Sequence, residues 1–381
     1  MVRQPEGVSR DRSSNTTKKA SIGQGNVAMV VLNWNSWSNT VECLESLQRL
    51  TYPDYRMLVV DNGSTDDSVK NIKSWAGGHV PVESDFFEFD ARTKPVRVVE
   101  YDRATAEAGE VTEDERCING LAPSQHLVLI HCGDNLGIAG GYNVGIRYAL
   151  ARGFDYIWVM NNDVVLDPVC LELCVETLVS DPQIGVVAPK VLYYSNPSHV
   201  AVAGGLLRLW QGKMLLFGVG APDGDAFSGT RDTAFVAGCA LLGRRMVYEQ
   251  LGLWAEEYFV IHEDSDWSAR VGRSSDFAMA VNLDARVWHK EGGVSDTGDI
   301  SPVSAYFANR NRFILVFRHG SWVEKLAFSA FYLLSRLPKF LLLLARGRRN
   351  LVAAELNAVV DFVLSRYGPA DERKMRLWRS S

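Results

Sequence analysis

Short apolar runs alternate with amphipathic stretches at the start of the chain. Val27–Leu32 and Tyr55–Val60 are continuous and apolar, a pattern typical of strands buried on both faces. Between them, apolar residues recur at helical spacing from about Ser38, and Tyr52-Pro53 ends the predicted helix. This alternation of strand and helix predicts a mostly parallel, doubly wound α/β sheet.

The same alternation resumes further along the chain. Further elements are predicted as a strand at His126–Cys132, a helix through Leu150, a strand at Tyr156–Met160, a helix with Asp167 as N-cap and Pro168 as first residue, a strand at Ile184–Ala188, a β-rich segment over residues 193–232 and a helix that ends at Leu251.

Two segments break this pattern and set the predicted domain limits. Residues 1–25 are polar and lack the apolar core of a signal peptide, so we expect a disordered leader. Residues 26–300 form the predicted main domain, interrupted by an acidic insertion at residues 77–125 that is read as partly disordered. That insertion is either a lid or an inert loop.

Residues 301–381 are predicted to be a helical extension. From Arg318 onward the chain has twelve Lys and Arg against five Asp and Glu. Its apolar runs, Leu326–Leu334 and Phe340–Ala345, are each shorter than the roughly 18–20 residues that a spanning helix needs. Two interpretations stay open: peripheral membrane contact through residues 321–349, or a helical cap on the main domain.

The net charge and the cysteine pattern limit the classes of function that fit the chain. The chain has 381 residues and a net charge of −5, which argues against nucleic-acid binding. None of its six cysteines forms a Cys-x-x-Cys pair, as expected of buried thiols in a reducing, cytoplasmic compartment.

Polar residues follow three of the predicted strands. They are Asn33-Trp34-Asn35, Asp61-Asn62-Gly63-Ser64 and Asn161-Asn162-Asp163. Ligands of open α/β sheets bind beyond the carboxyl ends of the strands, so these segments are expected to form one site. Oxygen ligands such as the Asp163 carboxylate suit a hard divalent cation.

Two further segments carry candidate chemistry. Glu263, Asp264 and Asp266 follow an apolar approach, and either cap a helix N-terminus or supply a general base. His289 is either a metal ligand or a structural residue.

Together these segments resemble the family 2 glycosyltransferases of the GT-A fold. The matching motifs, in order, are VVLNWNSWSNTVECLESL, LVVDNGSTDDSV, GDNLGIAGGYNVGI, YIWVMNNDVVLDP, FVAGCALLGRR, FVIHEDSDWSAR and VWHKEGG, and they cover roughly residues 27–293. The rhamnosyltransferase-like branch of bacterial polysaccharide biosynthesis is the most similar in character.

The resemblance implies an inverting transfer of one sugar from a nucleotide-diphosphate donor, such as dTDP-rhamnose, to a glycan or lipid-linked glycan acceptor. Asp264 would be the general base, with Glu263 beside it. Asp163 and His289 would bind Mn²⁺ or Mg²⁺. The donor-binding residues implied are Asn33, Asn35, Asp61, Asn62, Ser64, Asn135, Gly140, Gly141, Asn161 and Asn162.

The sequence departs from the family pattern at two motifs. Asn161-Asn162-Asp163 replaces the first carboxylate of the DxD motif by an amide, which removes one charge from the expected metal site. The QxxRW motif of processive synthases is absent from the sequence, which favours single-sugar addition. The alternative of a non-catalytic binding module for sugar nucleotides or polysaccharides predicts loss of Asp163 or of the Glu263-Asp264 pair, and both are present. A nucleotidyltransferase would need a Gly-rich, basic segment after the first strand, and a membrane scaffold would act through its tail.

Overall fold

The computed structural model describes residues 25–118, 120–290 and 300–379, and the expected leader lies outside them except for Gly25. Its strands are β1 (Val27–Asn33), β2 (Tyr55–Asp61), β3 (Arg97–Asp102), β4 (His126–His131), β5 (Tyr156–Asn161), β6 (Val164–Leu166), β7 (Ile184–Tyr193), β8 (Val200–Val202), β9 (Gly205–Arg208), β10 (Lys213–Leu216), β11 (Thr230–Asp232), β12 (Ala240–Arg244) and β13 (Ala278–His289).

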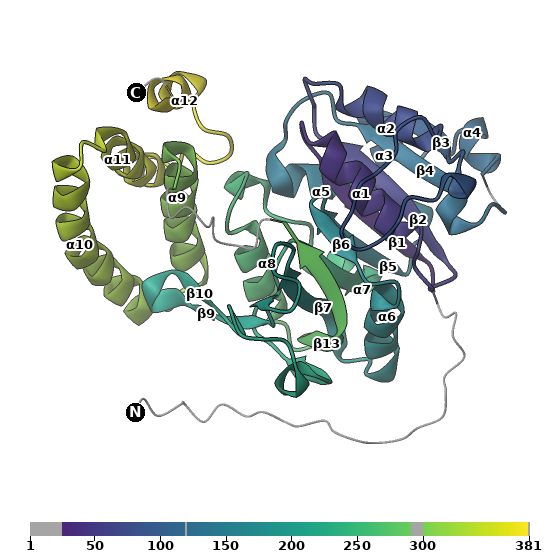
Figure 1. Ribbon diagram of the computed structural model, residues 1–381. Helices are drawn as coiled ribbons and strands as arrows, with labels where there is room; N and C mark the ends of the chain where they lie inside the picture. Colours follow the sequence, from purple (N-terminus) through teal and green to yellow (C-terminus); the bar gives the residue numbers. More distant parts are fainter. Residues whose placement is uncertain (1–24, 119, 291–299, 380–381) are drawn as a thin grey trace.

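One mixed sheet forms the centre of the molecule, with strand order β11-β13-β7-β12-β5-β1-β2-β4-β3 (Figure 1). The run β5-β1-β2-β4-β3 is parallel throughout. β12 lies antiparallel to both β5 and β7, while β13 is parallel to β7. This mixed, mostly parallel sheet confirms the predicted GT-A-type α/β class.

Helices cover both faces of the sheet. The helices of this main part are α1 (Trp37–Leu47), α2 (Ser68–Ala76), α3 (Arg103–Ala108), α4 (Glu113–Arg116), α5 (Gly137–Arg152), α6 (Cys170–Ser180), α7 (Arg245–Leu251) and α8 (Glu263–Val271). The C-terminal helices α9 (Pro302–His319), α10 (Trp322–Ala345), α11 (Arg349–Val363) and α12 (Glu372–Arg379) form a group to one side of the sheet (Figure 1).

Alternate residues of β1 point into two separate cores. Val27, Met29 and Val31 pack with residues of α1, α2 and α6. Ala28 and Val30 pack with residues of α5, α7 and α8 on the opposite face. All five are fully buried, which explains why β1 is a continuous apolar run instead of an alternating one.

Residues 77–125 correct one expectation, because they are not simply an insertion. They contain β3, which pairs in parallel with β4 at the edge of the central sheet. Glu115, from the acidic cluster, is buried and accepts hydrogen bonds from Arg152, Tyr101 and Tyr148. Because this segment is acidic, the sequence pattern did not reveal β3 or the burial of Glu115, whose cationic partner is Arg152.

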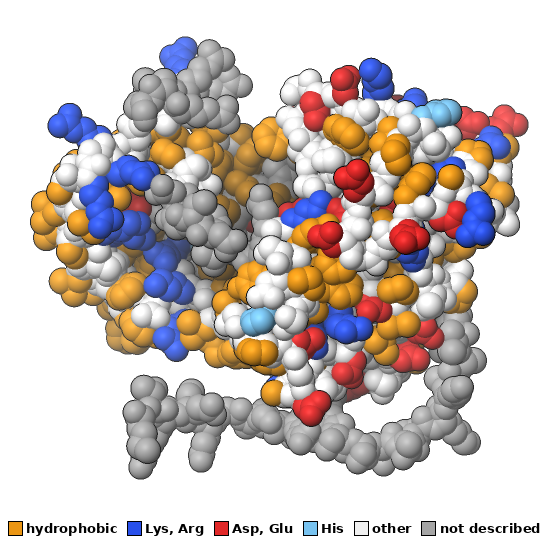
Figure 2. Space-filling model, in the orientation of Figure 1, with side chains coloured by type: hydrophobic (Ala, Val, Ile, Leu, Met, Phe, Trp, Pro, Cys, Tyr) orange, Lys and Arg blue, Asp and Glu red, His pale blue; other side chains and the backbone are white. Residues whose placement is uncertain are grey.

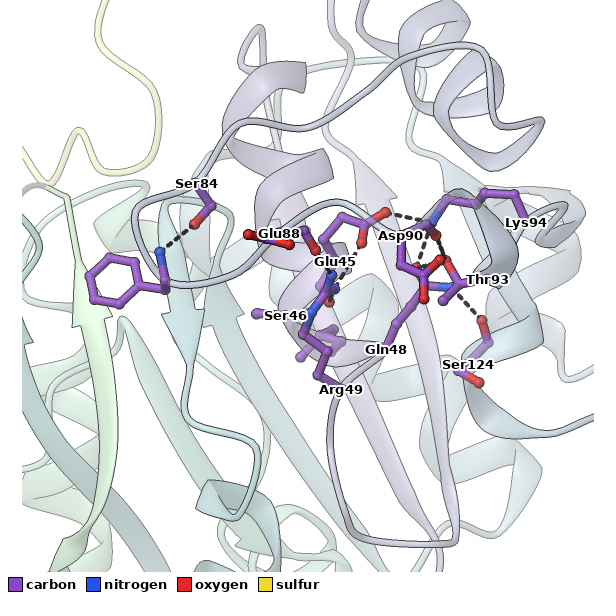
Figure 3. A network of polar contacts seen from close by, with 12 residues as sticks. Glu45, Ser46, Gln48, Arg49, Ser84, Glu88, Asp90, Thr93, Lys94 and Ser124 are labelled. Carbon is purple, nitrogen blue, oxygen red and sulfur yellow. Dashed lines mark hydrogen bonds and ion pairs between the residues drawn. The ribbon is translucent and has the colours of Figure 1, made fainter.

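A buried polar network fastens residues 84–94 to α1 (Figure 3). Glu45 on α1 is fully buried and lies 2.5 Å from the Lys94 ammonium. The Glu45 carboxylate also accepts hydrogen bonds from the Trp75 indole, at 2.8 Å, and from Arg49, at 2.8 Å. A buried carboxylate with three donors is stable only while those donors stay in place.

Two other local expectations differ from the structure. α6 begins at Cys170 instead of Pro168, and Asp167 accepts a hydrogen bond from the Val169 amide in the turn before it. The strand predicted at Ile184–Ala188 continues to Tyr193, because it pairs along much of its length with β13, which the sequence pattern did not reveal.

The C-terminal helices correct the prediction for the apolar tail. The two short runs belong to one helix, α10, which has 24 residues and continues through Pro338. It is the one helix of the described residues that is long and apolar enough to cross a membrane, and 11% of its most apolar window is buried. Lys and Arg residues interrupt the two apolar runs in the sequence. In the helix these residues lie on one side and leave the opposite side apolar.

The outward side of α10 is strongly apolar and exposed. Leu333 is 71% exposed, Leu334 78% and Leu337 67%. Figure 2 shows hydrophobic side chains on the C-terminal helices, beside a row of Lys and Arg. Such an apolar face on a surface helix is typical of a contact site for lipid or for another molecule.

Replacing Glu45 by Ala is expected to lower the free energy of unfolding by about 3–5 kcal/mol, because the Lys94 ammonium would stay buried without its partner. Chemical denaturation measures this change. Glu88→Ala removes an exposed carboxylate from the same segment and should change stability by less than about 0.5 kcal/mol. Equal effects of the two substitutions would contradict the buried-pair interpretation.

Candidate active site

A cavity of about 290 Å³ lies where β5, β13 and the start of α8 converge. Asn161 ends β5, His289 ends β13, and Glu263 and Asp264 open α8. All four residues line this cavity. The structure therefore brings together segments that are more than one hundred residues apart in the chain.

Strand pairing places His289 beside Asp163. β6 and β13 run antiparallel with His289 opposite Val164, and the Lys290 amide donates a 3.0 Å hydrogen bond to the Asp163 carbonyl oxygen. The His289 Nε2 atom then lies 3.1 Å from the Asp163 Oδ1 atom. The sequence prediction named both residues, and the paired strands explain how they meet.

The donor atoms of this pair suit a divalent cation. Asp163 Oδ1 is buried and, apart from the 3.1 Å contact with His289 Nε2, has no hydrogen-bond partner within the described residues, so it keeps a free lone pair. A carboxylate oxygen suits Mg²⁺, Ca²⁺ or Mn²⁺, and an imidazole nitrogen suits transition-metal ions. No cluster of three or more His, Cys, Asp or Glu ligands occurs among residues 25–118, 120–290 and 300–379. Further ligands would therefore come from a bound diphosphate or water.

Glu263, which is buried, and Asp264, which is partly buried, form an acidic pair. Burial, together with the charge of Asp264, raises the pKa of Glu263 from its ordinary 4.5 to about 8. Burial also raises the pKa of Asp264, although amide donors at Gly238 and Ser265 act in the opposite direction. Because Asp264 has these donors and Glu263 Oε2 has none within the described residues, the pair is best described as ionised Asp264 beside neutral Glu263.

Asp266 has a different, structural role. Burial alone would raise its pKa, but hydrogen bonding from His319 and the charges of Arg270 and Arg318 hold the pKa below its usual range. Its Oδ1 atom lies 2.7 Å from His319 Nε2. Asp266 therefore links α8 to α9 through Arg318 and His319, whereas Glu263 and Asp264 line the cavity. α8 has no side-chain hydrogen bond at its N-cap.

Cys239 lies within the influence of both halves of the site. Burial, and then the charges of Asp163 and Asp264, raise the pKa of the Cys239 thiol to about 12. The thiol therefore stays protonated at neutral pH. Cys239 lines the same cavity as Asp264 and His289.

The predicted donor-binding residues after β1 and β2 form a hydrogen-bonded group. The Asn33 side chain donates to Asp61, at 2.8 Å, and to Ser64, at 3.1 Å. The Ser64 hydroxyl accepts a bond from the Asn35 amide. A carboxylate offers about four lone-pair sites, so Asp61 keeps acceptor capacity for a ligand.

Asn62 and Asn135 are also joined, in a neighbouring turn. Asn62 donates to Asn135 Oδ1 at 3.2 Å and accepts from the Leu136 amide at 3.0 Å. These two side chains shape the loop between β4 and α5. Asn62 is buried, so it positions this loop more than it offers a surface to a ligand.

Asn161 and Asn162 separate at the end of β5. Asn161 accepts a hydrogen bond from the Tyr142 hydroxyl at 2.8 Å and lines the cavity. Asn162 turns toward α1 and donates to Thr40 at 2.9 Å and to the Ser36 carbonyl oxygen at 3.1 Å.

Gly140 and Gly141 do not form a turn beside the cavity. They lie inside α5, and a Cβ at Gly141 would approach Leu32 to 2.4 Å, so glycine there permits close packing of helix on sheet. Gly137 is the position that requires glycine conformationally, because it has a φ of +75° and lies against the Phe259 carbonyl oxygen. The turn expected at Gly140 and Gly141 is therefore a stretch of helix, and their contact with the donor stays a prediction.

Asn311 on α9, which the sequence did not single out, holds the turn at residues 258–262 before α8. Phe259, Ile261 and His262 all have positive φ values immediately before α8. The Asn311 amide donates hydrogen bonds of 2.7–2.8 Å to the carbonyl oxygens of Tyr258, Val260 and Ile261. Strained backbone of this kind persists only where its surroundings hold it.

The buried charge beside Asn311 adds to this support. Arg310 is fully buried and donates to the Glu257 and Tyr258 carbonyl oxygens. The run Asn309-Arg310-Asn311-Arg312 in an otherwise apolar helix is the sequence signal that could have found these residues.

Two family models match the chain, and together they span the fold. "Glycosyl transferase family 2" matches residues 28–88, and "Glycosyltransferase like family 2" matches residues 98–313. The second match alone covers more than half of the chain. The chain belongs to glycosyltransferase family 2.

Curated relatives of this family-2 chain match over only part of their length. Human hyaluronan synthase 3 is 24% identical over 185 residues, which is 47% of this chain and 32% of the relative. Hyaluronan synthase 2 of Rattus norvegicus is 28% identical over 157 residues, 39% of this chain and 26% of the relative. The match thus spans about a third or less of those proteins.

Solved structures with similar architecture have low sequence identity. A mannosyltransferase, PcManGT of Pyrobaculum calidifontis in complex with GDP-Man and Mn²⁺, is 16% identical with a TM-score of 0.48, covering 92% of each chain. GalNAc-T7 with UDP, GalNAc and Mn²⁺ is 13% identical with a TM-score of 0.48, covering 80% of this chain and 54% of its own.

Replacing Glu263 by Gln is expected to change how stability depends on pH. Because the unfolded chain releases the Glu263 proton at lower pH than the folded chain, stability falls as pH rises from about 4.5 to 8. The Tm of E263Q should therefore rise relative to wild type over this interval, by about 2–4 °C or more.

Thermal unfolding at several pH values measures this difference, with Glu113→Gln, an exposed carboxyl, as the control. If E263Q and wild type keep a constant Tm difference from pH 5 to pH 8, the pKa of Glu263 is not raised in the folded state.

Proposed function

We propose that this chain is an inverting glycosyltransferase that moves one sugar from a nucleotide-diphosphate donor to an acceptor hydroxyl. The observation that carries the proposal is the single cavity lined by His289, Glu263 and Asp264, with Asp163 in contact with His289. One side of this cavity offers ligands for a cation and a diphosphate, and the other offers a general base.

The proposed mechanism is a single displacement at the anomeric carbon. Asp264, ionised and oriented by the Gly238 and Ser265 amides, accepts the proton of the acceptor hydroxyl as its oxygen attacks. The bond from the anomeric carbon to the diphosphate oxygen breaks on the opposite side, so the configuration inverts. Neutral Glu263 beside Asp264 avoids a second negative charge near the attacking oxygen.

The donor side is proposed to involve Asp163, His289 and the residues that follow β1 and β2. Asp163 and His289 would hold Mn²⁺ or Mg²⁺, which neutralises the charge that develops on the diphosphate leaving group. Asp61, held by Asn33 and Ser64, would accept a hydrogen bond from the nucleotide base. Asn35 and Asn161 would complete the donor pocket, while Asn62, Asn135 and Asn162 would hold its loops in place.

The proposed donor and acceptor rest on the motif resemblance, and the proposed membrane contact rests on the C-terminal helices. We propose dTDP-rhamnose as the donor, because the motifs resemble the rhamnosyltransferase-like branch, and a glycan or lipid-linked glycan of polysaccharide biosynthesis as the acceptor. A cytoplasmic location with peripheral membrane contact through residues 321–349 is supported by the exposed apolar face of α10.

Replacing Asp264 by Asn is expected to reduce transfer by about 10²–10⁴-fold while donor binding stays close to wild type, because only the proton acceptor is lost. Transfer from radiolabelled sugar nucleotide and donor binding by calorimetry measure the two effects. Asp276→Asn, an exposed carboxylate just beyond α8, serves as the control and should retain activity. Near wild-type turnover by D264N would refute the assignment of the base. A wild type that binds donor but never transfers sugar would favour a binding module.

Replacing Asp163 by Ala is expected to weaken donor binding in the presence of Mn²⁺ by about tenfold or more, because one ligand of the cation is lost. A thermal-shift series of nucleotide sugars, with Mn²⁺ and with chelator, measures this loss and identifies the donor. In chelator, D163A and wild type should bind alike. Identical donor binding by both proteins in Mn²⁺ would remove the metal from the mechanism.

A further inference from the structure

A second and larger cavity lies beside the candidate active site. It has a volume of about 620 Å³, within the range of pockets that bind small molecules. Residues of α9, α10, α11 and the β9–β10 hairpin line it. Met214 and Ile261 line both this cavity and the one that contains Asp264. A molecule in this space would therefore be next to the proposed general base.

The lining of this cavity is strongly basic. Its cationic residues are Lys213, Arg312, Arg336, Lys339, Arg346 and Arg348. Glu355 is the acidic residue of the same lining, and it already contacts Lys339, at 2.6 Å, and Arg336, at 3.3 Å. The cavity thus keeps a surplus of positive charge that would attract an anion.

Arg312 is a partly buried cation of this lining. Its Nε atom donates a 2.8 Å hydrogen bond to the Gly212 carbonyl oxygen, which holds the side chain in place. No carboxylate of the described residues forms an ion pair with Arg312. Burial, and then the charge of Arg336, lowers the pKa of Arg312 to about 10, so it remains a cation at neutral pH. A partly buried guanidinium without an ion-pair partner suits a phosphate oxygen.

Helix α10 separates this basic lining from an exposed apolar surface. Arg336, Lys339 and Leu343 line the cavity at helical spacing. Leu334 and Leu341, on the other side of the helix, are 78% and 61% exposed. An amphiphile with an anionic head and a hydrocarbon tail matches both surfaces at once.

We propose that this cavity binds the phosphate or diphosphate headgroup of a lipid-linked acceptor, whose hydrocarbon chain lies against the apolar face of α10. A sugar attached to that headgroup then reaches the neighbouring cavity, where Asp264 accepts the proton of its hydroxyl. This inference rests on the proposed function, since it names the acceptor class for the same site. Arg312 and Arg346 bind the headgroup and take no part in the chemistry.

The test compares binding of the full chain to three kinds of vesicle by co-flotation. One is phosphatidylcholine alone, one contains farnesyl diphosphate, and one contains phosphatidylserine at equal surface charge. Binding is expected to be strongest to the farnesyl diphosphate vesicles. Inorganic pyrophosphate in solution is expected to compete for the same site without replacing the need for the lipid.

Two cavity variants and one control isolate the site. Arg312→Gln and Arg346→Gln should each weaken binding to the farnesyl diphosphate vesicles, Arg312→Gln by about tenfold or more. Arg346 is exposed, so its variant remains informative if Arg312→Gln fails to fold. Arg349→Gln removes the same charge from an exposed position of α11 that does not line the cavity, and it should bind like wild type.

Equal binding to both anionic vesicles, or equal loss in the cavity and control variants, would overturn the proposal and indicate general surface charge. Binding of pyrophosphate without binding of the lipid would overturn it in favour of a free phosphate ligand. Stabilisation by nucleotide sugars is measured on the same proteins. If it persists while lipid binding fails, the acceptor inference alone is wrong; if it is absent while lipid binding holds, the proposed transfer is wrong.

Discussion

The burial of Glu263 beside a second carboxylate, the partly buried Asp264, is the constraint on which the candidate site depends. These two neighbouring residues at the start of α8 are largely removed from solvent, where two negative charges repel each other and water screens them poorly. A protein keeps such a pair only where neighbouring groups determine which carboxylate is ionised. Here the Gly238 and Ser265 amides donate to Asp264 and favour its ionised form. The pair therefore consists of an ionised Asp264 and a neutral Glu263.

That arrangement depends in turn on the C-terminal helices. The backbone before α8 adopts left-handed conformations at three residues that are not glycine, and Asn311 on α9 donates to three carbonyl oxygens of this segment. The residues after position 300 are therefore part of the site. The same helices enclose the basic cavity, so the turn before α8 and the proposed acceptor site share one structural support.

The parallel half of the fold could be read from the sequence, because each strand there is buried on both faces and appears as an uninterrupted apolar run. β1 and β2 follow this rule closely. β3 did not, since its residues alternate between buried and exposed at the sheet edge and lie in an acidic stretch. β13 was missed because the helical α8 and the polar turn after it gave no sign of a long strand to come.

Residues that act through local motifs were predictable, whereas those that act through tertiary contacts were not. Asp163 and His289 were named together from the motifs, and the β6–β13 pairing places them 3.1 Å apart. The role of Asn311 depends on α9 packing against the turn at residues 258–261, which no spacing in the sequence encodes. The close packing of Gly141 against Leu32 likewise depends on a tertiary contact that the motif does not reveal.

The most direct test of this account is a crystal structure of the full chain with a nucleoside diphosphate and Mn²⁺. The account predicts that the ion is coordinated by both Asp163 and His289, with the diphosphate bridging toward the cavity that Asp264 lines. An ion bound elsewhere, or a nucleotide outside the carboxyl ends of β1, β2 and β5, would contradict the central claim that these residues form one active site.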